Sequence, residues 1–182
     1  MAISPRNART PDSRRSPPLS THVRIEARLA ALGLVLPEPL QTPPDVRLPF
    51  KPVRVRSNRA YVAGHGPLNA DGSLAGPFGK VPVEVSPEQA YQSARLVFLA
   101  MLASLKRELG DLDRVTAWLR IFGMVNSTLD FTSQPSVING CSDLLLELWG
   151  VEAGQHARSA VSMASLPFNI PVEIEAEVEI SP

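Results

Sequence analysis

The most regular stretch of the chain is Val172-Glu173-Ile174-Glu175-Ala176-Glu177-Val178-Glu179-Ile180. Apolar residues and glutamates alternate strictly, so this pattern predicts a β-strand with one buried face. In the simplest interpretation the four glutamates form a solvated face. However, four like charges in line repel one another, and a sheet covered by helices on one side often needs a second subunit on the other.

The segments before this strand predict the rest of the domain. Ser86-Pro87-Glu88-Gln89 is the clearest helix start, because serine caps, proline takes the first helical position and glutamine completes a capping box. The predicted elements are two short strands in 52–63 around the Ser57-Asn58-Arg59 turn, a helix from Ser86 ended by Gly110, a strand from Val115 to Val125, a helix from Pro135 to Trp149 closed by Gly150, and a strand from Arg158 to Leu166. This order predicts an α+β fold with both helices on one face of the sheet.

The strand from Val115 to Val125 is rich in branched and aromatic residues, as expected of a central strand. Strict alternation places Trp118 and Phe122 on one side and Leu119 and Ile121 on the other, with both faces covered.

Prolines separate the first quarter of the chain from the rest. Ten of the 18 prolines fall within the first 52 residues, where the usual share of about 5% would give about three. Residues 1–20 are rich in arginine and serine and predict a disordered tail. Residues 21–47 predict a short helix, from Thr21 to Leu32, followed by a proline-rich connector, and residues 48–182 form the predicted main domain. An arginine-rich start also suits an organelle transit peptide, but it lacks an apolar face, so we expect a cytoplasmic protein.

Composition excludes several classes of protein. The 182 residues, 44% of them hydrophobic, suit one globular domain with a tail. A single cysteine excludes an internal disulfide, and no apolar stretch approaches the ~20 residues that cross a bilayer. With 18 basic and 18 acidic residues the net charge is zero, so we expect neither a membrane partner nor avid nucleic-acid binding.

Few residues offer a chemical site by spacing alone. The histidines, His22, His65 and His156, are not paired at helical spacing, so no metal site is predicted. Cys141 falls on the apolar side of the second long helix, where a free cysteine usually acts as a small hydrophobe. Arg158 follows a loop end, where its guanidinium is placed to bind a carboxylate; an ordinary surface ion pair is the alternative interpretation.

A family resemblance emerges from a group of short motifs. Ala157-Arg158-Ser159-Ala160-Val161, Leu166-Pro167 and Pro171-Val172-Glu173-Ile174-Glu175-Ala176 follow one another in the order and spacing of the RidA (YjgF-like) family, also named endoribonuclease L-PSP or chorismate-mutase-like proteins. Pro49-Phe50, the Ala63–Pro67 segment and both long helices extend the resemblance over about residues 48–180. The preceding Ile25-Glu26-Ala27-Arg28-Leu29 helix with its proline-rich connector, and Val137-Ile138-Asn139-Gly140 further on, resemble a branch of that family with an N-terminal extension.

The resemblance implies a homotrimer whose sheets form a central barrel, with a small carboxylate ligand bound in the clefts between subunits. It implies hydrolytic deamination of 2-imino and enamino acids to 2-oxo acids and ammonia, without a cofactor. By position, Arg158 matches the arginine that holds the substrate carboxylate. Glu173 matches the glutamate that positions or activates water. Phe50, Ala63, Gly64, Asn139 and Ala160 fall at positions that line the ligand.

Three of these positions depart from the deaminase branch. Ala160 replaces a cysteine, Ala63 replaces a serine and Phe50 replaces a tyrosine. The pocket should therefore be drier, and it should suit a more apolar carboxylate. A non-catalytic, carboxylate-binding regulatory trimer is the alternative function. Ribonuclease activity is a third hypothesis that the zero net charge disfavours.

Overall fold

The structure, a computed structural model, describes residues 25–42 and 45–182. The tail expected at 1–20 and the first four residues of the helix expected from Thr21 lie outside this part. The elements are α1 (Ile25–Ala31), β1 (Val53–Arg56), β2 (Arg59–His65), α2 (Pro87–Leu109), the 3₁₀ helix η1 (Leu112–Arg114), β3 (Val115–Asn126), α3 (Gln134–Gly154), β4 (Ala157–Met163), the 3₁₀ helix η2 (Pro167–Asn169) and β5 (Val172–Ile180).

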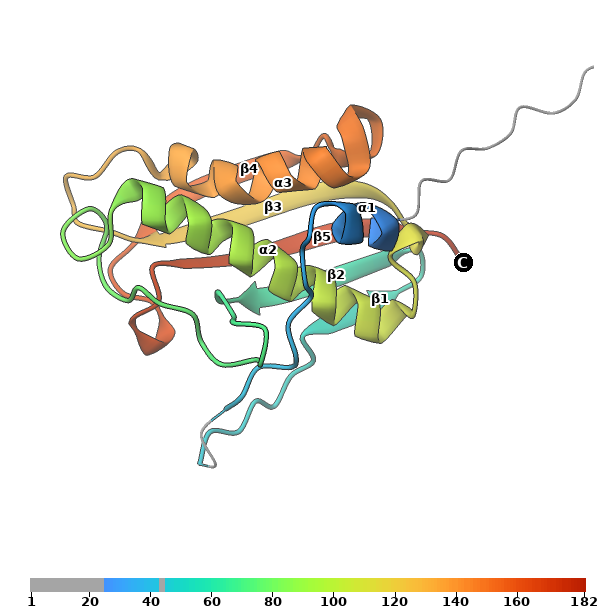
Figure 1. The fold of residues 1–182 in the computed structure, drawn as a ribbon, viewed down its shortest axis with the longest axis horizontal. Coiled ribbons are helices and arrows are strands. Elements are labelled where there is room, and N and C mark those ends of the chain that lie inside the picture. The colour runs from blue at the N-terminus through green and yellow to red at the C-terminus, as the bar shows by residue number, and fades with distance from the viewer. Residues whose placement is uncertain (1–24, 43–44) are drawn as a thin grey trace, which may run out of the picture.

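The five strands form one mixed sheet in the order β1-β2-β5-β3-β4. All neighbours are antiparallel except β3 and β4, which are parallel and joined through α3. Helices α2 and α3 lie side by side on one face of the sheet (Figure 1). The predicted α+β class, with both long helices on one face, is confirmed, and β5 spans the residues that the alternation predicts.

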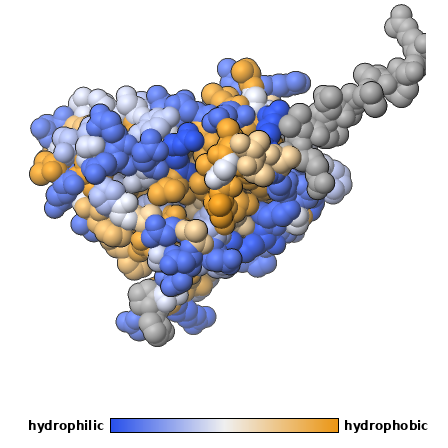
Figure 2. Space-filling model, in the orientation of Figure 1, coloured by the Kyte–Doolittle hydropathy of each residue, from blue (hydrophilic) through white to orange (hydrophobic). Residues whose placement is uncertain are grey.

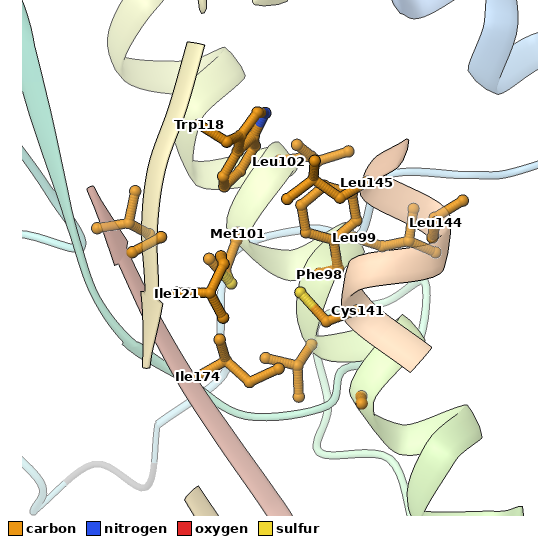
Figure 3. Packing of buried hydrophobic residues seen from close by; sticks show 14 of the residues in the cluster. Phe98, Leu99, Met101, Leu102, Trp118, Ile121, Cys141, Leu144, Leu145 and Ile174 are labelled. Carbon is orange, nitrogen blue, oxygen red and sulfur yellow. The ribbon is translucent and has the colours of Figure 1, made fainter. Parts of the chain in front are cut away.

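The two long helices bury the apolar faces that their spacing predicts. At the start of α2, Ser86 accepts a hydrogen bond from the Gln89 backbone and Gln89 bonds back, which is the predicted capping box. The helices approach closely at Gly140, where a Cβ atom would lie 2.1 Å from the Tyr91 carbonyl oxygen. Between helices and sheet, Trp118 packs with its ring centre 5.1 Å from that of Phe98, among the aliphatic side chains drawn in Figure 3. Among the residues described, no helix is both long and apolar enough to cross a bilayer.

The predicted faces of β3 are wrong. A β-bulge between Trp118 and Arg120 adds one residue to β3 and changes the phase of the alternation. As a result, Trp118 and Ile121 both face the helices and are fully buried. Phe122 pairs with Glu175 on the opposite face, where it is only partly buried in the single chain.

Three element ends differ from prediction by two residues or more. The regular part of α3 breaks at Gly150, whose φ of 74° is in the left-handed region, but a further turn runs on to Gly154. Strand β4 stops at Met163 rather than Leu166, because its partner β3 ends at Asn126, opposite Met163. Strand β2 continues beyond Ala63 to His65.

The N-terminal segment packs against the domain through η1 and α3. Ile25 and Leu29 of α1 belong to the hydrophobic core, and the Ile25 amide donates to the Asp113 carboxylate at 2.7 Å. The other end of the fold reaches the same 3₁₀ helix, because the Ser181 amide donates to the Arg114 carbonyl at 2.8 Å. An apolar patch lies over α1 and the residues after it (Figure 2).

Candidate functional site

A β-bulge in β2 shapes the first part of the candidate site. The pairing of β2 with β5 shifts register between Val62 and His65, so that Ala63 and Gly64 both stand opposite Glu175. Two residues of β2 thus face one residue of β5, and the β2 backbone bulges out of regular pairing near the start of β5.

His65 supports the bulge from the helix side of the sheet. Its Nδ1 lies 2.7 Å from the Ala63 carbonyl oxygen and its Nε2 lies 2.8 Å from Ser104 Oγ on α2. Burial lowers the pKa of His65, and the charge of Arg107 lowers it further. A neutral ring donates from Nδ1 to Ala63 and accepts from the Ser104 hydroxyl, so every polar atom of the ring is satisfied.

Gly64 leaves space for the carboxylate of Glu173. A Cβ atom on Gly64 would lie 2.0 Å from Glu173 Oε1 and 3.0 Å from its Cδ, so any other residue here displaces that group. Burial raises the pKa of Glu173, and the negative charge of Glu175 raises it further. A carboxyl group with a raised pKa is suited to exchanging protons with a ligand near neutral pH.

A hollow of about 420 Å³ lies on the helix-free face of the sheet, next to the bulge. It contains two of the predicted ligand-lining residues, Phe50 and Ala63; Phe50 is 55% exposed. The hollow is lined by Phe50, Lys51, Arg54, Tyr61, Val62, Ala63, Arg120, Glu175, Ala176 and Glu177. Arg120 Nη1 lies 3.8 Å from Glu175 Oε1, and the guanidinium carbon of Arg120 is 5.5 Å from the centre of the Phe122 ring. The hollow therefore offers aromatic surface beside groups of both charges.

The second part of the site lies between β4 and α3. Arg158 Nη1 donates to Asn139 Oδ1 at 2.8 Å and to Ser142 Oγ at 2.9 Å. Its Nη2 donates to the Pro135 carbonyl oxygen at 3.4 Å. Ala160, two residues along β4 on the same face, packs against the core. Arg158, Asn139 and Ala160 are thus brought together, as three of the predicted site residues.

Sequence reasoning missed Ser142 as a partner of Arg158. The signal was its position, since Ser142 stands three residues after Asn139 and the two side chains share one helix face. The sequence does not show how α3 lies over β4, so that spacing alone could not indicate a contact with Arg158.

Within one chain, the two parts lie on opposite faces of the sheet. Arg158 pairs with Ile121, whose side chain is buried beneath the helices. Glu173 pairs with Met124, three residues further along β3, and residues an odd number apart point to opposite faces. A single copy therefore does not bring the Arg158 guanidinium and the Glu173 carboxylate into one cavity.

Cys141 belongs to the core rather than to the site. Its sulfur points into the cluster of Figure 3, and burial raises the pKa of its thiol to about 12. Such a thiol stays protonated at neutral pH and is a poor nucleophile.

One group of carboxylates has the spacing of a cation site. Oxygen atoms of Glu26, Asp111 and Asp113 lie within 4.8 Å of one another. Lys106 already donates to Glu26 at 2.5 Å, and backbone amides donate to all three. The group is explained as the anchor of α1 on η1.

Two relatives resemble this chain over most of its length. Protein TCP17 of Trypanosoma cruzi is 36% identical over 158 residues, which are 87% of this chain and 95% of that protein. The crystal structure of Atu1372 from Agrobacterium tumefaciens is 39% identical, covers 86% of this chain and 92% of its own, and superposes with a TM-score of 0.77.

A more distant structure shares the fold alone. The crystal structure of E. coli TdcF with bound serine is 17% identical, covers 79% of this chain and 99% of its own, and has a TM-score of 0.53. The family model described as "YjgF/chorismate mutase-like, putative endoribonuclease" matches residues 26–175. Because that match spans both parts of the candidate site and the whole sheet up to β5, the chain belongs to the YjgF/chorismate mutase-like family.

Proposed function

We propose that this protein hydrolyses 2-imino or enamino acids to 2-oxo acids and ammonia, in a site assembled between copies of the chain. The observation that carries the proposal is that one sheet holds the Arg158 guanidinium, fixed by hydrogen bonds, on one face and Glu173, a carboxyl group of raised pKa, on the other. Neighbouring copies resolve this separation if the β4 edge of one meets the helix-free face of the next. We propose three copies, with one such site at each of three interfaces.

The helix-free face has the character of a surface that is covered by another copy. Phe50 and Tyr61 are 55% and 42% exposed there, and Phe122 is only partly buried. The glutamates of β5 lie on the same face. A second copy would bury the aromatic groups and bring a cation, Arg158, towards those carboxylates.

The chemistry assigns one task to each residue. Arg158 holds the substrate carboxylate and so fixes C2 of the imine relative to Glu173. The Glu173 carboxylate accepts a proton from water as the water oxygen bonds to C2 and the C2–N double-bond electrons pass to nitrogen, and Glu173 then gives that proton to the nitrogen. In the second step Glu173 accepts the hydroxyl proton of the resulting amino alcohol and passes it to the nitrogen, while the C2–O double bond forms, the C2–N bond breaks and ammonia leaves. Atoms balance as one imine and one water giving one 2-oxo acid and one ammonia.

The lining suggests a substrate with an apolar side chain. Ala63 and Ala160 have no side-chain polar atom, and Phe50 has no hydroxyl. Fewer hydrogen bonds orient the ligand, so apolar contact with the Phe50 ring must supply more of the affinity. We therefore expect imines of leucine or phenylalanine to be better substrates than the imine of alanine.

Mixing two inactive variants tests the shared site. Arg158→Ala and Glu173→Gln should each reduce the release of 2-oxo acid from enzymatically generated imines by about 100-fold or more. When equal amounts are unfolded and reassembled together, about a quarter of the sites receive both intact residues, so about a quarter of wild-type activity should return. The control mixture pairs Arg158→Ala with the Arg158→Ala/Glu173→Gln double variant and should restore none. A site contained in one chain would give no restoration in either mixture.

The loss of polar lining also favours a second candidate, a regulatory protein that binds a small carboxylate without converting it. Calorimetry with 2-oxo acids separates the two functions. Arg158-dependent binding in a protein that does not accelerate imine hydrolysis would support the regulatory function and contradict the enzyme.

A further inference from the structure

Behind Arg158 lies a short hydrogen-bond chain that begins at His156. His156 Nδ1 lies 2.7 Å from the Gly154 carbonyl oxygen, which can only accept, so Nδ1 carries the proton. In the uncharged ring Nε2 then accepts, and Ser142 Oγ, 3.0 Å away, donates to it. The remaining lone pairs of Ser142 Oγ accept from Arg158 Nη1 at 2.9 Å. The donor and the acceptor of each hydrogen bond from His156 to Arg158 are thus defined.

The same arrangement occurs a second time in the fold. His65 has Nδ1 on the carbonyl two residues before it and Nε2 on Ser104 Oγ, which in turn accepts from Arg107 Nη2 at 3.0 Å. Arg107 uses its other terminal nitrogen to hold the Pro37 carbonyl oxygen of the connector at 3.2 Å. A histidine acting through a serine therefore fixes an arginine at two places.

Within residues 25–42 and 45–182, the hydrogen bonds of Arg158 involve the two terminal nitrogens of its guanidinium and not Nε. Nη1 donates to Asn139 and Ser142, and Nη2 donates to Pro135. These acceptors follow one another along α3, in the order Pro135, Asn139, Ser142, so the helix occupies the end of the guanidinium. In a guanidinium, Nε–H lies on the same edge as Nη2, and Nη2 carries two protons, so this edge can donate two parallel hydrogen bonds to the oxygens of a carboxylate.

We propose that His156 is a positioning residue, which acts through Ser142 to turn the Nε–Nη2 edge of Arg158 towards the ligand. The proposal rests on the proposed function and specifies how its carboxylate is recognised. Ser142 alone can rotate its hydroxyl and release Arg158, whereas Ser142 bonded to His156 keeps its lone pairs directed at Nη1. His156 therefore sharpens the preference for a planar carboxylate over a neutral group of the same shape.

The probes are pyruvate, which carries a carboxylate, and pyruvamide, which carries a neutral amide in its place. Binding is measured by calorimetry on the full-length protein. Removing one hydrogen bond costs about 1 kcal/mol, so His156→Ala should weaken pyruvate binding about fivefold and leave pyruvamide binding unchanged. His156→Gln, whose side-chain oxygen can accept from Ser142, should recover most of the loss. Tyr91→Phe is the control, because it removes a 2.9 Å hydrogen bond to Asp143, the residue after Ser142, without touching Arg158.

Each contrary result has a distinct meaning. If His156→Ala leaves the ratio of the two affinities unchanged, or lowers both affinities equally along with the melting temperature, the positioning role is overturned while the proposed function stands. If Arg158→Ala itself leaves pyruvate binding intact, the proposed function fails first. Loss of carboxylate preference in His156→Ala with its return in His156→Gln supports the proposal.

Discussion

Replacing Gly64 by alanine tests whether the Glu173 carboxylate must lie where the structure places it. The new Cβ atom would lie 2.0 Å from Glu173 Oε1, whereas ordinary van der Waals contact begins at 3.4 Å, so the oxygen must move by about 1.4 Å, the difference between these distances. The obstructed group is the end of a flexible side chain, and Gly64 has no left-handed φ, so the fold should tolerate the change. A displacement of about 1 Å can cost about 100-fold in rate.

The assay is the release of 2-oxo acid from imines generated in place, followed with the melting temperature. Gly66→Ala is the matched control, because the nearest atoms to its Cβ would be side-chain ends of Ile170, at 2.9 Å, and of Leu74, at 3.7 Å, and not Glu173. We expect Gly64→Ala to lose about 100-fold in kcat/KM with a melting temperature close to that of Gly66→Ala. Equal activity of the two variants would refute the reasoning, because it would show that the reaction does not depend on the position of this carboxylate.

Three further predictions concern groups around the site and the core. The raised pKa of Glu173 means that the folded state holds the Glu173 proton more tightly than the unfolded chain does. This group therefore favours folding below the usual glutamate pKa and loses that contribution as pH rises through its pKa in the folded state. Glu173→Gln should raise the melting temperature at pH 7 and not at pH 4, and an equal rise at both would contradict this origin. Gly140→Ala places a Cβ 2.1 Å from the Tyr91 carbonyl oxygen, a backbone atom that cannot rotate away. The free energy of unfolding should therefore fall by about 3 kcal/mol and the melting temperature by roughly 10 °C in thermal unfolding. A fall below about 1 kcal/mol would show that α2 and α3 can move apart at little cost. Cys141, buried with a thiol pKa of about 12, should react with a thiol reagent at pH 8 only as fast as the protein unfolds, and rapid labelling of the folded protein would disagree with its position.

The sequence predicted the architecture where one physical signal dominates. The alternation of Val172–Ile180 specified β5 to the residue, because a strand with one buried face cannot shift by one position without exposing its apolar set. The capping residues at Ser86 likewise marked the start of α2. The faces of β3 were wrong because a bulge depends on pairing with a partner strand, and alternation within one strand carries no record of it.

For the candidate site, the residues could be named from sequence but their grouping could not. Arg158 with Asn139 and Ala160, and Glu173 with Gly64, are pairings of segments distant in the chain. That Arg158 and Glu173 occupy opposite faces follows from the register of β3 with both of its neighbours. The roles of Ser142 and His156 depend on the same register, because it is β4 that brings Arg158 over α3.

The meeting of both ends of the fold at η1 makes the order of its elements open to rearrangement. Asp113 receives the amide that begins α1, and the next residue, Arg114, receives the amide that follows β5. A short linker could therefore join the end of β5 to the start of α1. New termini could then open at the turn containing Leu129, whose side chain is entirely exposed. Such a circular permutant would keep every strand pairing and both parts of the site, since the sheet order depends on register and not on where the chain begins.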